Sequence, residues 1–77
     1  MKAYGYAHDT EAKPLELYEV TLSAQPERLR ELAFFIAQCA DEIEQLPNTW
    51  SHSHFTPATE DIAKNRLSLV IFNPNSQ

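Results

Sequence analysis

The sequence predicts an α+β fold, a two-layer sandwich in which an antiparallel sheet of about four strands is covered on one face by one long helix. Short segments near both ends alternate apolar and polar side chains, as half-buried strands do. A longer segment between them repeats its apolar residues at the helical period. The order is therefore strand, strand, helix, strand, strand, in a single domain over residues 1–77.

The two N-terminal strands are expected at residues 2–7 and 15–23, joined by a polar loop that ends in a proline. Gly5 is the only glycine in the chain, and it marks either a close backbone approach or a tolerated position at a sheet edge. In the second strand one face is apolar and the other polar. The apolar residues of that face are Tyr18, Val20 and Leu22.

The helix is expected to begin at Pro26, because proline at the first helical position loses no needed hydrogen bond. Gln25 is a weak cap, and Pro47 should end the helix after about residue 46. One apolar stripe is expected to pack on the second and last strands. It comprises Leu29, Leu32, Ala33, Ile36, Ala40 and Ile43.

After the helix, residues 50–55 alternate as a short strand does, and residues 56–65 are polar enough for a loop. Residues 66–73 are apolar on both faces, which predicts a central last strand. With 77 residues the core must be small, so a partner or a second copy would help to stabilise it.

The net charge is −5, which argues against nucleic acid or an anionic membrane as the natural ligand. A basic protein surface would suit the chain better, although an acidic surface can simply keep a small protein soluble. No apolar leader follows Met1 and no long apolar segment is present, so we expect a cytoplasmic protein without a membrane span.

No residues form a recognisable catalytic site, and we expect neither enzymatic activity nor a cofactor. His52 and His54 would share one face of a strand, with His8 as a third candidate metal ligand, but the rest of a metal site is lacking. We interpret these histidines as polar strand residues. Cys39 lies beside the apolar stripe of the helix, where a thiol is expected to pack rather than react.

Four residues are candidates for partner binding. Phe34 projects to the polar side of the helix, where an aromatic residue is out of place. Asp41, Glu42 and Glu44 cluster near the helix C-terminus, where negative charge opposes the helix dipole. A solitary exposed aromatic and a solvated acidic face are the structural alternatives.

Several segments of the chain resemble the Imm32 family of bacterial immunity proteins, small α+β proteins encoded beside polymorphic toxins. These segments, as letters of the sequence, are YGY at 4–6, LYEVTL at 17–22, PE at 26–27, LRELA at 29–33, CADEI at 39–43, HSHF at 52–55 and LVIFN at 69–73. The resemblance implies that the protein binds and neutralises a cognate toxin.

Three hypotheses follow. The protein is an immunity protein that binds a cognate toxin, a structural or regulatory homodimer anchored by Phe34, or a metal-binding protein that uses His52 and His54. The resemblance and the acidic surface favour the first hypothesis.

Overall fold

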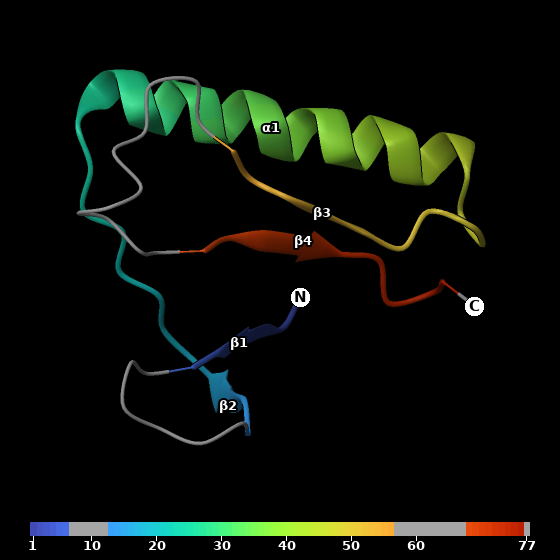
Figure 1. Ribbon diagram of the computed structural model, residues 1–77, viewed down its shortest axis with the longest axis horizontal. Coiled ribbons are helices and arrows are strands. Elements are labelled where there is room, and N and C mark those ends of the chain that lie inside the picture. The colour runs from blue at the N-terminus through green and yellow to red at the C-terminus, as the bar shows by residue number, and fades with distance from the viewer. Residues whose placement is uncertain (7–12, 57–67, 77) are drawn as a thin grey trace.

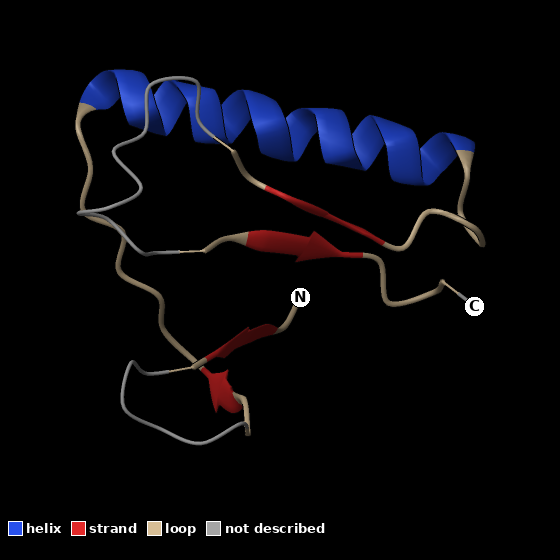
Figure 2. Cartoon of the chain, in the orientation of Figure 1, coloured by secondary structure: helices blue, strands red, loops and turns tan. Residues whose placement is uncertain are grey.

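The computed structural model describes residues 1–6, 13–56 and 68–76 and contains one helix and four short strands. Their order confirms the predicted α+β class and is shown in Figures 1 and 2. The elements are β1 (Ala3–Gly5), β2 (Leu15–Leu17), α1 (Pro26–Gln45), β3 (His52–His54) and β4 (Val70–Phe72). The loop expected at residues 8–14 and the one expected at 56–65 lie largely outside the described residues.

The strands form two separate antiparallel pairs, so the prediction of one four-stranded sheet is wrong. β1 pairs with β2, and β3 pairs with β4. Figure 1 shows the β1–β2 hairpin set apart from α1, with β3 and β4 between them in this view. The second strand ends at Leu17, because residues 18–25 have no strand partner within the described part of the chain. The alternation of apolar and polar residues predicted which side chains share a face. It does not determine whether another strand lies alongside to pair with the backbone.

Gly5 allows a close approach inside the N-terminal hairpin. It lies opposite Leu15, diagonal to Leu17 on the same face. A Cβ atom added at Gly5 would stand 3.1 Å from Cδ1 of Leu17, closer than carbon atoms usually pack. The missing side chain therefore lets Leu17 lie across the strand.

Both ends of α1 agree with the prediction. Pro26 opens the helix, and the carbonyl of Gln25 accepts the backbone N–H groups of Arg28 and Leu29 at 3.0 Å. The Gln25 side chain makes no capping hydrogen bond. At the other end, the backbone N–H of Leu46 donates to the carbonyl of Glu42 at 2.9 Å, just before Pro47. Local proline chemistry thus sets both boundaries.

The face that α1 turns toward β3 and β4 is not the predicted one. Cys39 is 3% exposed, and Phe35 beside it is half-buried. Leu29 and Ile36 were expected in the core but are 42% and 45% exposed. At 100° per residue, the buried face is rotated by roughly a quarter of a turn from the predicted stripe. The predicted strand partners, Tyr18, Val20 and Leu22, are exposed as well.

The β3–β4 pair has one covered and one open face. Ser53 pairs with Ile71 on the face toward the helix, and both are half-buried. The pairs His52 with Phe72 and His54 with Val70 occupy the other, exposed face. Among the described residues β4 has only β3 as a neighbour, so the last strand is not central as predicted.

The end of β4 is tied to the turn that follows the helix. Asn73 is 0% exposed, and its side-chain amide donates to the carbonyls of Pro47 at 2.9 Å and Trp50 at 2.8 Å. Its backbone N–H donates to the carbonyl of Ser51 at 2.8 Å, which continues the β3–β4 ladder. Cys39 and Asn73 are the two residues that are buried within the described segments.

Candidate functional site

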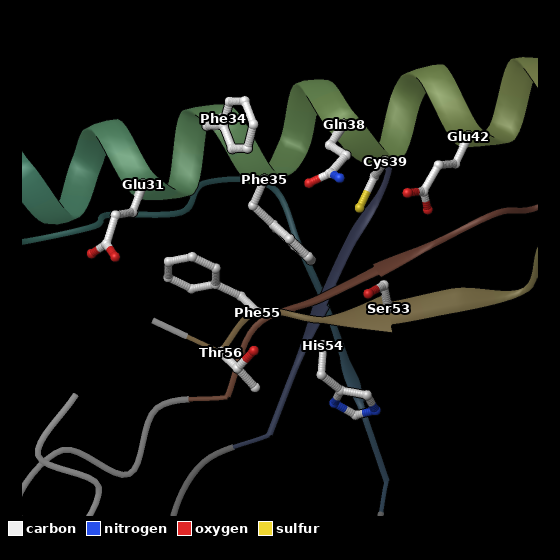
Figure 3. A pocket seen from close by; sticks show the side chains of 10 residues that line it. All are labelled: Glu31, Phe34, Phe35, Gln38, Cys39, Glu42, Ser53, His54, Phe55 and Thr56. Carbon is white, nitrogen blue, oxygen red and sulfur yellow. The ribbon is translucent and has the colours of Figure 1, made fainter. Parts of the chain in front are cut away.

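A groove of about 460 Å³ runs between α1 and β3. The close view in Figure 3 shows Phe35 and Cys39 pointing from the helix toward β3. Phe55, just after β3, meets Phe35 with the ring centroids 5.3 Å apart and the rings tilted by 45°. This aromatic pair and the Cys39 thiol give the groove an apolar floor.

Phe34 lines the same groove and is 70% exposed, which confirms its predicted projection out of the core. Gln38 and Thr56 are further lining residues. An aromatic side chain that is mostly in solvent, next to an apolar floor, is the arrangement in which a partner residue can be stacked and desolvated.

The charged residues in the lining are acidic. Glu31 and Glu42 contribute carboxylates, His54 contributes an imidazole at the edge, and the described residues that line the groove include no lysine or arginine. Glu31 forms an ion pair with Arg28 along the helix. Glu42 accepts a hydrogen bond at 2.8 Å from the indole N–H of Trp50. The groove therefore favours cationic and apolar groups on a ligand.

The structure separates the acidic cluster that the sequence grouped as a candidate partner site. Glu42 is half-buried and lines the groove, as Phe34 does about two helical turns away. Asp41 and Glu44 are exposed and do not line it. At 100° per residue, neighbours along a helix point in very different directions, so three nearby carboxylates need not share one surface.

The Cys39 thiol is a packing group in this site. Burial raises the pKa of the Cys39 thiol above its usual value of 9.0, and the negative charge of Glu42 raises it further. A neutral thiol is a poor nucleophile, since the thiolate is the reactive form. Cys39 therefore contributes packing rather than a reactive thiolate to the groove.

His52 and His54 lie side by side on the open face of β3, with ring centroids 5.4 Å apart. The Ser51 hydroxyl and Nδ1 of His52 form a hydrogen bond of 2.9 Å. No third metal-ligating side chain joins the two imidazoles within residues 1–6, 13–56 and 68–76. The third candidate, His8, lies outside the described residues.

Sequence reasoning missed Phe35 and Phe55 as one cluster, and it missed the Trp50–Glu42 and Asn73 contacts. Helical spacing relates Phe35 only to its neighbours on α1, whereas the position of β3 is what brings Phe55 against it. The Asn-Pro-Asn run at 73–75 was a turn signal that could have drawn attention to Asn73.

Comparison with protein-family models, curated proteins and solved structures finds no match to this chain. No helix within the described residues is long and apolar enough to cross a membrane.

Proposed function

We propose that this protein is a non-catalytic immunity protein that binds and neutralises a cognate bacterial toxin through the groove between α1 and β3. The observation that carries the proposal is the exposure of Phe34, at 70%, beside the aromatic floor of an acidic groove. The sequence resemblance to Imm32 proteins supplies the class of partner.

The chemistry of the groove defines the segment that the toxin must present. Phe34, Phe35 and Phe55 offer aromatic surface to an apolar anchor residue. Glu42 and the net charge of −5 favour lysine or arginine around that anchor. Nucleases and other toxins that act on anionic substrates carry such basic surfaces, which an acidic protein can cover.

The test is rescue of growth when the protein is co-expressed with the toxin domain encoded by the adjacent gene. Phe34→Ala should abolish rescue and weaken binding by at least tenfold, because interfaces concentrate their energy in a few aromatic anchors. The control is Tyr18→Ala, which removes an aromatic ring that is 101% exposed and lies outside the groove. Full rescue by Phe34→Ala, or the absence of a toxin domain beside this gene, would contradict the proposal.

A positive charge introduced into the groove provides a second, independent test, because it should change the rate of association with the toxin domain. Gln38→Arg places a cation among the lining residues and should slow association with a basic toxin domain most strongly at low salt, because screening acts over about 10 Å at 0.1 M. Gln45→Arg, which makes the same change of charge at an exposed helix position outside the groove, is the matched control and should slow association less. If the two substitutions slow association equally, the binding surface is not the groove.

A further inference from the structure

Much of the side of α1 that the sequence assigned to the core is left exposed by the residues that the structure describes. Leu29 and Ile36 are 42% and 45% exposed, and Ala33 and Ala40 between and after them are exposed as well. Ile43, at the end of the same row, is half-buried. We name these five residues the open stripe. Phe34 lies roughly 130° around the helix from it, so the groove and the open stripe are separate surfaces.

From these observations we infer that two copies of the chain associate through their open stripes, with the two α1 helices antiparallel about a two-fold axis near Ile36. The large residues Leu29, Ile36 and Ile43 recur every seven positions, and so do the small residues Ala33 and Ala40. An interface around a two-fold axis must be complementary to itself. The row meets that requirement, because large and small residues follow one another in the same order when it is read from either end.

The antiparallel register matches large residues with large and small with small. Ile36 meets Ile36 of the second copy at the axis, and Leu29 meets Ile43 of the second copy at each end. Between them, Ala33 faces Ala40 of the second copy, which lets the helix backbones approach closely. A row of apolar residues with alternating spacings of four and three is the seam by which long helices pair.

Charge favours the antiparallel over the parallel arrangement. Arg30 and Glu44 are exposed and lie on the same side of the open stripe. In the antiparallel pair, each Arg30 stands close to Glu44 of the second copy, whereas a parallel pair would separate these two residues by about 21 Å along the helix axes. The acidic end of each helix, unfavourable for its own dipole, then lies beside the positive N-terminal end of the other helix.

The experiment is the mass of the purified chain in solution, measured by sedimentation equilibrium at about 10 to 100 μM. The expected mass is twice 8.8 kDa. Ile36→Lys, which sets two positive charges against each other at the axis, should give a folded monomer by circular dichroism. Phe34→Ala, on the other side of the helix, is the control and should remain a dimer. A monomeric wild type, or a dimer unaffected by Ile36→Lys, would overturn the inference.

Charge exchange tests the register without altering the apolar seam. Arg30→Glu and Glu44→Arg should each raise the dimer Kd by roughly tenfold, and the double variant should restore it, because each pair is then reversed in sign. This rescue also decides the case in which Ile36→Lys fails to fold. If both single variants weaken the dimer and the double variant weakens it further, the antiparallel register is wrong. These measurements need no toxin, so their outcome is independent of the proposed function.

Discussion

The indole N–H of Trp50 donates a hydrogen bond to Oε1 of Glu42 at 2.8 Å, joining the last turns of α1 to the chain that enters β3. Both residues are half-buried, and their separation in sequence is eight residues. The bond spans the turn at Pro47. It links Trp50, which precedes β3, to a carboxylate that lines the groove. Glu42 therefore has a structural partner in addition to its place in the proposed toxin-binding surface.

Loss of the hydrogen bond between Trp50 and Glu42 should lower the free energy of unfolding, and the effect of changing one partner should depend on whether the other is present. We expect a coupling of about 1 kcal/mol between Trp50→Phe and Glu42→Ala in a double-mutant cycle, the scale of a partly exposed hydrogen bond to a charged group. Urea unfolding followed by circular dichroism gives the four free energies. The matched control pairs Trp50→Phe with Glu44→Ala, whose carboxylate is exposed, and its coupling should be near zero. Equal couplings in both cycles would show that Trp50 acts through packing alone.

Asn73 should be far more sensitive to substitution than its exposed neighbour. Asn73→Asp keeps the shape of the side chain but removes the amide donor, so the carbonyls of Pro47 and Trp50 lose their partner. Each of these part-buried hydrogen bonds contributes about 0.5 to 1.5 kcal/mol, so we expect a loss of about 1 to 3 kcal/mol in the free energy of unfolding. Asn75→Asp introduces the same charge at an exposed position and is the control. Similar urea midpoints for the two variants would contradict this role for Asn73.

The Cys39 thiol should make the protein less stable in alkali. Because its pKa is raised in the folded chain, the unfolded chain releases the thiol proton first as the pH increases. The contribution to stability is full below the usual pKa of 9.0 and falls as the pH rises from there through the folded-state pKa. The check is the urea midpoint between about pH 7 and pH 10.5 for wild type and Cys39→Ala. The wild type should lose more stability than the variant, and parallel profiles would refute the assignment.

His52 and His54 should hold no structural metal. Two imidazoles without further ligands fall short of the three or four protein ligands that zinc sites use. Dialysis against a chelator should therefore leave the circular dichroism spectrum and the thermal midpoint unchanged. The variant with both His52→Ala and His54→Ala serves as a control for loss of the ring contact itself. Stoichiometric zinc in the purified protein would reverse this interpretation.

The sequence predicted those features that depend on neighbours along the chain. Pro26 and Pro47 set the helix boundaries within a turn of their positions, and alternation located the core of the strand at His52–His54. The exposure of Phe34 followed from helical geometry alone. Each of these outcomes rests on backbone rules that operate over a few residues.

Features that depend on distant segments were not predictable in the same way. The rotation of α1 was misjudged because the more apolar stripe was assumed to face the sheet, whereas Phe35 and Cys39 face β3 instead. Strand pairing was misjudged because alternation identifies a strand but not its neighbour. The groove requires Phe55 beside Phe35, a contact between residues twenty positions apart in the sequence that periodicity does not report.

The division of the described strands into two separate pairs has a consequence for how the protein opens. Amide hydrogen exchange reports the free energy of each local opening, and β1–β2 shares no strand with β3–β4. The backbone amides of the N-terminal hairpin should thus exchange through openings of low free energy. Those near Cys39 and Asn73, the two buried residues within the described segments, should exchange only on global unfolding. The hairpin and the helical layer would then behave as two cooperative units of unequal stability.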